Sequence, residues 1–317
     1  MEMNNDKLRV LITGANGFIG SHIVAHLIKD ENYKLGITLR KSSDIWRIKQ
    51  YIENIESFYI DEETIEEIIS KFKPDLVIHL AVYYRKKHVY NDIDEMINTN
   101  IILPTKILDA MSKNNVKFLI NTGTFTEYLI DTIDLKPQSY ISPSNLYSVT
   151  KVSFEDILKF YVNSYNINAI TLKLFAPYGY MDNPKKLIPY LINCALEDKV
   201  AETSLGEQMW DFVYVKDVAR AYINGINYLL NSRERYSAFN VGSGEAHSIK
   251  EIADIISNLG KKLRVNWGAI PYSDTETFYV KADITSSRNI LKWRPKYSIN
   301  DGLLETYEWY RRKLNNE

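Results

Sequence analysis

Tyr147 and Lys151 form the pattern Tyr-x-x-x-Lys at the beginning of a segment, residues 146–165, that is predicted to be helical. A separation of four places both side chains on one helix face, one turn apart. A free tyrosine has a pKa of about 10, and a nearby ammonium group lowers that pKa by favouring the phenolate. Such a tyrosine can give a proton to a carbonyl oxygen while a hydride reaches the carbonyl carbon. Because the chain has 23 tyrosines, the pattern alone is weak evidence.

A second pattern with chemical meaning is TGANGFIG, in which Gly14, Gly17 and Gly20 lie between a predicted strand and a predicted helix. Glycine allows a positive φ and lets a pyrophosphate approach the backbone. The free N–H groups and the dipole at the beginning of the helix favour an anion. The spacing is G-x-x-G-x-x-G and not the general G-x-G-x-x-G. The pattern predicts a dinucleotide phosphate site, and a tight turn without a ligand is the alternative.

Strand-like and helix-like segments alternate through the first half of the chain, which is typical of a doubly wound α/β fold with a parallel Rossmann sheet. The segment 75–82 is an almost continuous apolar run, as expected for a strand buried on both faces. The predicted strands are 8–14, 34–40, 58–60, 75–82, 117–124 and 168–175, with short strands at 212–215 and 239–242. The predicted helices are 21–30, 64–71, 92–114, 146–165, 187–198 and 248–259.

The alternation becomes less regular after about residue 175. We therefore predict a dinucleotide-binding Rossmann domain over residues 1–175, to which roughly 212–242 return. Residues 176–317 are predicted to form a smaller, mixed α/β substrate-binding domain that closes over the carboxyl edge of the sheet. The polar tail, 307–317, is expected to fray.

Composition limits the classes of partner. The 317 residues include 39 Lys and Arg against 40 Asp and Glu, so the chain has no overall attraction for nucleic acid or an anionic membrane. No apolar stretch of about 18 residues is present. The single cysteine, Cys194, allows no intrachain disulfide. The histidines do not cluster as metal ligands, and His79 lies in an apolar run where a structural role is favoured. We expect a soluble, cytoplasmic protein without a metal, a nucleic-acid partner or a membrane partner.

The two patterns occur together with further motifs in a fixed order. TGANGFIG, VIHLA and YSVTK, followed by LGEQMWDFVYVKDVARAY, FNVGSGE and LKWRPKYS, resemble the extended short-chain dehydrogenase/reductases that modify nucleotide sugars. The resemblance covers nearly the whole chain. It is greatest to reductases of 4-keto-6-deoxy sugars carried on a nucleoside diphosphate. It implies an NAD(P)-dependent oxidoreductase that forms a homodimer through the helices predicted at 92–114 and 146–165.

The resemblance also implies which residues bind the cofactor. Leu39 stands where NAD-binding members have an acid, and Arg40 follows it. Arginine suits the extra phosphate of NADP, so NADP(H) is favoured, whereas NAD(H) is the alternative if Arg40 is only a solvated loop charge. Asp61 matches an adenine-contacting acid or a helix N-cap. Asn100 matches an asparagine of a proton relay or a buried amide that ties backbone together. The full predicted set is Gly14, Asn16, Gly17, Phe18, Ile19, Gly20, Arg40, Asp61, Leu80, Ala81, Asn100 and Lys151.

By the same resemblance, Lys151 also holds the nicotinamide ribose and a third catalytic residue ends the strand before Tyr147. Counting back four residues from Tyr128 selects Thr124, and Thr122 is the competitor. The hydroxyl of that threonine would hydrogen-bond the substrate oxygen and stabilise developing charge.

The two residues that follow Thr124 argue against a sugar dehydratase. Sugar 4,6-dehydratases carry an acidic pair where this chain has Phe125 and Thr126, and phenylalanine cannot transfer a proton. Glu127 is close in sequence but is expected to point elsewhere.

The substrate half departs from the family pattern at three positions. Ala176 stands in place of an asparagine, and Trp210 and Ser273 stand in place of arginines that normally meet the diphosphate. Either other cationic side chains bind the diphosphate in place of these arginines, or the substrate has no diphosphate. Trp210 would stack on a base or sugar, or simply pack. The replacement cations are Arg85, Lys86, Lys87, Lys185 and Lys186, and a solvated loop is the alternative for 85–88. The predicted substrate-binding residues are Tyr84, Arg85, Thr122, Ala176 and Trp210.

The patterns together predict NADPH-dependent reduction of a keto-sugar, with Tyr147 as proton donor, Thr124 as hydrogen-bond donor and Lys151 tuning Tyr147. An NAD-dependent nucleotide-sugar 4-epimerase is the main alternative. A non-catalytic, cofactor-sensing or scaffolding member is the other, although such members tend to lose the tyrosine or the lysine.

Overall fold

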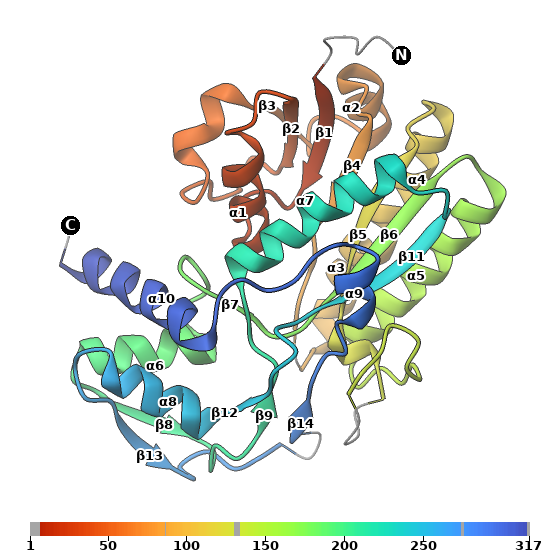
Figure 1. Ribbon diagram of the computed structural model, residues 1–317. Coiled ribbons are helices and arrows are strands. Elements are labelled where there is room, and N and C mark those ends of the chain that lie inside the picture. The colour runs from red at the N-terminus through yellow and green to blue at the C-terminus, as the bar shows by residue number, and fades with distance from the viewer. Residues whose placement is uncertain (1–6, 86, 130–133, 274–275, 316–317) are drawn as a thin grey trace. The chain divides into compact units, whose positions relative to one another are not determined.

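Seven strands form one sheet in the order β11-β6-β5-β4-β1-β2-β3 (Figure 1). The computed structural model describes residues 7–85, 87–129, 134–273 and 276–315. The strand pairs β1–β2, β1–β4, β2–β3 and β4–β5 are all parallel. The strands are β1 (Leu8–Thr13), β2 (Tyr33–Leu39), β3 (Glu56–Tyr59), β4 (Leu76–His79), β5 (Phe118–Thr124), β6 (Asn168–Leu174) and β11 (Tyr236–Val241). The predicted Rossmann-like α/β fold is confirmed. The strand order reverses at β1 and β4, which is where such sheets bind ligands.

Helices cover both faces of this sheet. Helices α2, α4 and α5 pack together on one face, and α1 and α7 lie on the other (Figure 1). The helical segments are α1 (Phe18–Leu27), η1 (Lys49–Asn54), α2 (Ile65–Phe72), η2 (Tyr90–Asp92), α3 (Ile93–Ile97), η3 (Asn98–Ile102), α4 (Leu103–Lys113), η4 (Phe125–Glu127), α5 (Leu146–Ser164) and α7 (Val215–Asn231). The long helix predicted at 92–114 is interrupted by η3, which is a π-helical turn.

The core of this region lies between the sheet and α2, α4 and α5. Leu11 and Leu119 from the strands meet Phe72 and Leu158 from the helices, and all four are fully buried. A Cβ atom at Gly36 would lie 2.8 Å from the Phe72 ring, so β2 and α2 can pack this closely only with glycine there. Burial of both sheet faces explains why these strands appear in the sequence as apolar runs.

The chain divides into two compact units. The first unit comprises residues 1–127, 141–173 and 219–239, and the second comprises 128–140, 174–218 and 240–317. The second unit has three small sheets, β10-β7, β12-β9-β14 and β13-β8. Its elements are β7 (Pro177–Tyr178), α6 (Leu187–Leu196), β8 (Val200–Thr203), β9 (Met209–Trp210), β10 (Val213–Tyr214), β12 (His247–Ser248), α8 (Ile249–Asn258), β13 (Arg264–Trp267), β14 (Tyr279–Val280), α9 (Thr285–Asn289) and α10 (Ile299–Leu314).

Two buried carboxylates hold the loops of the second unit. Asp211 accepts the backbone N–H groups of Ser243, Gly244 and Ala282. Asp217 accepts those of Lys296 and Tyr297. These contacts join the stretches WDFVYVKD, NVGSG and WRPKYS, which gives a structural reason for the motifs that carried the resemblance.

The expectation that the tail frays is wrong. Residues 299–314 form α10, which begins with a capping box between Ser298 and Asp301. Tyr307 and Tyr310 are buried, and the Tyr310 hydroxyl donates to the Asp182 carbonyl at 3.0 Å. The charged residues of α10 lie on its other face, so the mean polarity of the segment concealed a buried stripe.

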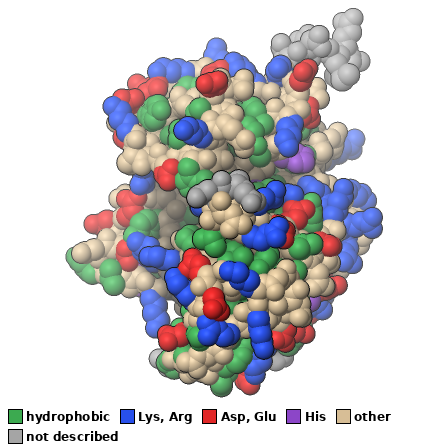
Figure 2. Space-filling view, turned by 90° about the vertical axis from the view of Figure 1, so that its left-hand side faces the viewer, with side chains coloured by type: hydrophobic (Ala, Val, Ile, Leu, Met, Phe, Trp, Pro, Cys, Tyr) green, Lys and Arg blue, Asp and Glu red, His purple; other side chains and the backbone are tan. Residues whose placement is uncertain are grey.

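No helix in the described part of the chain is long and apolar enough to cross a membrane. On the face shown in Figure 2, acidic side chains lie among the basic ones, in keeping with the near-zero net charge.

The core makes a prediction about stability. Leu158→Ala removes a fully buried side chain of α5 and should lower the free energy of unfolding by about 2–5 kcal/mol. Leu230→Ala makes the same chemical change at a position of α7 that is 42% exposed, and it should cost less than about 1 kcal/mol. Denaturant unfolding of both variants measures the difference, and equal losses would contradict the assignment of this core.

Candidate active site

The predicted catalytic residues come from two neighbouring segments of the first unit. Thr124 is the last residue of β5, and Tyr147 and Lys151 lie on the first two turns of α5. Helix α5 begins after Asn145, whose side chain accepts the Ser148 N–H at 2.9 Å. This N-cap fixes the beginning of the helix that carries both residues.

Tyr147 lies between a polar and an aromatic neighbour. The Thr124 hydroxyl is near enough to its side chain to affect its pKa, and the Tyr84 ring meets its ring edge to face, with 4.8 Å between centroids. Burial raises the pKa of Tyr147, the negative charge of Glu127 is the next contribution, and the Thr124 hydrogen bond acts in the opposite direction. The sequence predicted a pKa lowered by a nearby ammonium, whereas in the structure the pKa is raised and removal from water is the largest contribution.

Lys151 is 4% exposed. Burial lowers its pKa to about 8, against the opposing charges of Glu127 and Glu155. At neutral pH the side chain is thus mainly an ammonium group, but one that gives up its proton far more readily than a surface lysine.

The two threonine candidates have different surroundings. The Thr122 hydroxyl donates to the His79 carbonyl at 2.8 Å and meets the Tyr222 hydroxyl at 2.7 Å. The Thr124 hydroxyl belongs instead to a chain of hydroxyl groups. It lies 3.1 Å from the Thr126 hydroxyl, which lies 2.7 Å from the Ser148 hydroxyl, and Ser148 donates to Asn145 Oδ1 at 3.0 Å.

The Glu127 carboxylate has two partners inside the first unit. One carboxylate oxygen accepts the Thr124 N–H at 2.8 Å, and the other lies 2.9 Å from Lys173 Nζ. The side chain is therefore used inside the first unit, together with the buried Lys173.

The glycine-rich turn has the geometry that an approaching phosphate needs. Gly14 has φ of 69°, and a Cβ there would lie 2.7 Å from the Ala81 backbone nitrogen. A Cβ at Gly20 would lie 2.3 Å from the Gly14 carbonyl oxygen. Gly17 is the N-cap of α1 and provides no side-chain cap. Because glycine has no side chain, the residue at the N-cap accepts no hydrogen bond from the first N–H groups of α1 through a side chain. This arrangement suits a bound anion. The side chain of Asn16 donates to the Asp44 carbonyl.

His79 is a structural residue at the end of β4. The Thr13 hydroxyl accepts the N–H groups of Leu80 and Ala81, both at 3.2 Å, and lies 2.8 Å from His79 Nδ1. Since the hydroxyl proton is left to donate to Nδ1, the ring carries its own proton on Nε2. Burial lowers the pKa of His79 to about 3, so the ring is neutral.

Asn100, in the π-helical turn, uses its whole amide group. Its Oδ1 accepts the Tyr83 N–H at 2.8 Å, and its Nδ2 donates to the Tyr83 carbonyl and to the Thr150 hydroxyl, both at 3.0 Å. These bonds are those of an amide that ties backbone together. They attach the segment containing Tyr84 to α5.

The end of β2 carries residues that the sequence analysis predicted to select the cofactor. Arg40 Nη2 lies 2.7 Å from Glu95 Oε1, and both side chains are half exposed. Asp61 accepts the Lys41 N–H at 2.9 Å. The alternative that Asp61 is a helix N-cap is wrong, because Thr64 caps α2.

The comparison with known proteins decides the family. The model of the NAD dependent epimerase/dehydratase family matches residues 10–242. The chain belongs to this family. Similar proteins include CDP-abequose synthase from Salmonella muenchen, 28% identical over 93% of this chain and 95% of that protein. The UDP-glucuronate 4-epimerase of Thermodesulfobacterium geofontis is 27% identical over 96% of each chain. The structure of UDP-glucose 4-epimerase with UDP-glucose from Thermotoga maritima has a TM-score of 0.84 and 25% identity, over 96% of this chain and 99% of that one.

The three residues that depart from the expected family pattern, Ala176, Trp210 and Ser273, each form a hydrogen bond within the second unit. In the second unit, Trp210 Nε1 donates to the Thr277 carbonyl at 2.8 Å, and the Ser273 hydroxyl donates to Glu276 at 3.1 Å. The Ala176 carbonyl accepts the Val213 N–H. In the first unit, Arg85 Nε lies 3.5 Å from Asp92 Oδ1. Lys86 lies outside the described residues.

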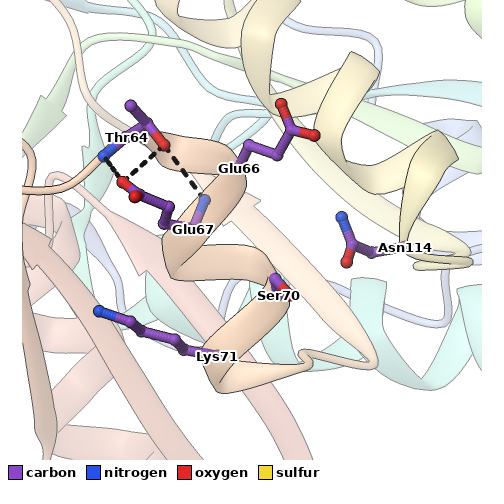
Figure 3. Close-up of a pocket in the computed structure, with 6 residues that line it drawn as sticks. All are labelled: Thr64, Glu66, Glu67, Ser70, Lys71 and Asn114. Atoms are coloured by element: carbon purple, nitrogen blue, oxygen red, sulfur yellow. Dashed lines mark hydrogen bonds between the residues drawn. The ribbon is translucent and has the colours of Figure 1, made fainter.

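A surface hollow next to α2 is not part of this site. It is lined by Thr64, Glu66, Glu67, Ser70, Lys71 and Asn114 (Figure 3). Thr64 and Glu67 form the capping box of α2 there, and none of the predicted site residues lines the hollow. No group of three or more His, Cys, Asp or Glu side chains arranged to hold a metal ion occurs among the residues that the structure describes.

The neutral His79 predicts a pH dependence of stability. Its pKa is about 3 in the folded protein and 6.5 in the unfolded chain. As the pH falls below 6.5, the unfolded chain binds a proton that the folded one does not. The free energy of unfolding should then fall by about 1.4 kcal/mol per pH unit on account of this residue. His79→Asn should remove that part of the slope in denaturant unfolding between about pH 5.5 and 4. Parallel slopes in the two proteins would contradict a neutral His79.

Proposed function

We propose that this family member is an NADPH-dependent oxidoreductase that reduces the keto group of a nucleoside-diphosphate-linked 4-keto-6-deoxy sugar. The observation that carries the proposal is the grouping of Thr124, Tyr147 and Lys151 at the carboxyl edge of the sheet. Its nucleotide-sugar part is supported by relatives whose names refer to CDP- and UDP-linked sugars.

In the proposed reaction, a bound nicotinamide cofactor supplies the hydride that reaches the carbonyl carbon. Tyr147 gives its phenolic proton to the carbonyl oxygen, which becomes the new hydroxyl group. Thr124 orients that oxygen by a hydrogen bond. Lys151, largely an ammonium group at neutral pH, stabilises the phenolate left behind.

Two features favour reduction over the other reactions associated with this family. Phe125 cannot serve as an acid or a base for dehydration, and the carboxylate of Glu127 is directed to Lys173. A 4-epimerase must begin by removing a proton from the sugar, so its tyrosine has to be a phenolate. Burial and the charge of Glu127 both raise the pKa of Tyr147, which favours a proton donor.

The cofactor is assigned to the glycine-rich turn and the end of β2. The uncapped beginning of α1 receives the pyrophosphate, and Arg40 receives the extra phosphate of NADP. The ion pair of Arg40 with Glu95 is half exposed, and such pairs contribute less than about 1 kcal/mol. The guanidinium group can therefore exchange Glu95 for a phosphate, which it binds in a two-pronged geometry.

Turnover is predicted with one or more nucleotide-linked keto sugars. NADPH oxidation at 340 nm is measured with TDP-, CDP-, GDP- and UDP-linked 4-keto-6-deoxy sugars. Tyr147→Phe removes only the phenolic hydroxyl and should lower kcat by about 10²–10⁴-fold. Tyr161→Phe is the matched control, because it makes the same change farther along the same helix, where the ring stacks on Tyr165, and it should retain most of kcat. Silence across the panel, with NADPH shown to bind, would refute the substrate assignment.

Cofactor choice is tested at Arg40. Arg40→Ala should weaken NADPH binding by about 10–100-fold, the loss of one charge-assisted hydrogen-bonding group, and should change NADH binding little. Glu95→Gln removes the competing carboxylate and should leave NADPH binding equal or tighter. Titration of intrinsic fluorescence gives each Kd. An equal loss for both cofactors in Arg40→Ala would contradict the NADP assignment.

A further inference from the structure

The chain between Thr124 and Tyr147 does not stay within the first unit. Residues 128–140 belong to the second unit, although the residues on either side of them in the chain belong to the first. Of this connecting segment, 128–140, the structure describes 128, 129 and 134–140. The two proposed catalytic groups are thus joined by a segment that packs within the second unit, and the mechanism proposed above gives this segment no role.

Tyr128, the first residue of the connecting segment, is anchored by its side chain. The residue is 1% exposed, and its hydroxyl donates to Oδ1 of Asn240 at 2.8 Å. Its ring lies against the ring of Phe175, with 6.5 Å between the centroids. Asn240 is fully buried. Because a buried polar group that loses its partner is costly, this hydrogen bond holds Tyr128 in one place.

The side-chain amide of Asn240 also reaches a second point of the connecting segment. Its Nδ2 donates to the Leu135 carbonyl at 2.7 Å and to the Asp283 carbonyl at 3.4 Å. Two carbonyl oxygens can only accept, so they require the NH₂ group, and Oδ1 is left for the Tyr128 hydroxyl. One buried side chain therefore fastens the connecting segment at both Tyr128 and Leu135.

The backbone of Leu135 has partners of its own. Its N–H donates to the Lys281 carbonyl at 2.8 Å, and its carbonyl accepts the Asp283 N–H at 2.8 Å. These bonds form a parallel bridge between Leu135 and Ala282. Next to it, Lys281 Nζ lies 2.7 Å from the Asp134 carboxylate. The connecting segment is thus held within the second unit by backbone bonds as well as by Asn240.

Glu127, immediately before Tyr128, connects this anchored segment to both proposed catalytic groups. Its side chain accepts the Thr124 N–H at 2.8 Å, and its main-chain carbonyl accepts the Ser142 N–H at 3.0 Å. Ser142 comes shortly before Asn145, the N-cap of α5. A carboxyl group can accept the Thr124 N–H in its ionised or its neutral form, so this link does not depend on the charge of Glu127.

We propose that Tyr128 and Asn240 are positioning residues, through which the second unit fixes the place of Thr124 and the beginning of α5. This role rests on the proposed function in so far as Thr124 and Tyr147 are the catalytic groups. A displacement of about 1 Å in a reacting constellation can cost about 10²-fold in rate. The geometry of the catalytic groups therefore depends on the unit that is predicted to bind the substrate.

Hydrogen–deuterium exchange of the full chain tests this role. Tyr128→Phe removes only the hydroxyl that is bonded to Asn240. Amides of residues 122–127 and 141–150 should then exchange at least about fivefold faster, because a buried hydrogen bond that holds their connection is lost. Exchange in α2 should stay unchanged. Unchanged rates in 122–127 and 141–150 would overturn the proposal, as would an equal rise in α2, which indicates general destabilisation.

Tyr310→Phe is the matched control. Tyr310 is also a buried tyrosine of the second unit, and its hydroxyl donates to the Asp182 carbonyl at 3.0 Å. The variant makes the same chemical change at a residue of α10, so it should speed exchange in α10 and leave 122–127 and 141–150 as they are. If it speeds exchange in those two ranges as much as Tyr128→Phe does, the specific role of Tyr128 is refuted.

A double variant keeps the test decisive if Tyr128→Phe fails to fold. Tyr128→Phe combined with Asn240→Leu replaces both partners of the hydrogen bond by apolar groups, a change that can be nearly neutral for stability. The Leu135 carbonyl keeps the Asp283 N–H as a donor. The same faster exchange is expected, because both contacts of the Asn240 amide with the connecting segment are gone. A folded double variant with unchanged exchange in 122–127 and 141–150 would refute the positioning role.

Amide exchange requires neither substrate nor cofactor, so this proposal and the proposed function fail separately. A silent substrate panel together with faster exchange refutes the reductase assignment and leaves the anchoring of Thr124 standing, whereas turnover with unchanged exchange does the reverse. Where turnover is found, Tyr128→Phe should lower kcat by about 10–100-fold and leave the Kd of NADPH unchanged. Tyr310→Phe should change neither. A merely structural role of Tyr128 would instead change kcat equally in the two variants.

Discussion

The hydroxyl group of Thr13 joins the ends of β1 and β4, and the geometry of the site follows from that junction. It accepts two backbone N–H groups from the segment that follows β4 and donates to His79. The backbone of Ala81 is thereby held against Gly14, where no Cβ would fit. Asn100 then ties Tyr83 to α5. The glycine turn and the helix carrying Tyr147 are therefore positioned by a few buried polar groups that hydrogen-bond one another and the backbone.

These polar groups are concentrated at one edge of an otherwise apolar sheet. Burial there has opposite effects on the two main groups, since it raises the pKa of Tyr147 and lowers that of Lys151. Both shifts favour the uncharged form, as removal from water always does. Glu127 opposes the shift of the lysine and adds to that of the tyrosine. Glu127 therefore raises the proton affinity of both groups, which moves the pKa of Lys151 back toward its ordinary value and that of Tyr147 further from it.

Sequence patterns predicted those features of the fold that depend on residues close together in the chain. Buried parallel strands produce apolar runs, so the alternation of strands and helices was readable, as was the common helix face of Tyr147 and Lys151. Features that depend on distant partners were not readable. The buried Tyr310 hydroxyl donates to the carbonyl of Asp182, which is far away in the sequence. Glu127 meets Lys173 only once β5 and β6 lie side by side. The direction of the Tyr147 pKa shift was mispredicted for the same reason, because burial is a property of the fold.

The row of hydroxyl groups behind Thr124 has a polarity. Asn145 Oδ1 can only accept, so Ser148 must donate to it. Thr126 then donates to Ser148, and Thr124 donates to Thr126. A ketone oxygen that requires a donor would receive the proton that Thr124 otherwise donates to Thr126. The hydroxyl row thus defines two states of the same four residues, distinguished only by the direction in which the Thr124 proton points.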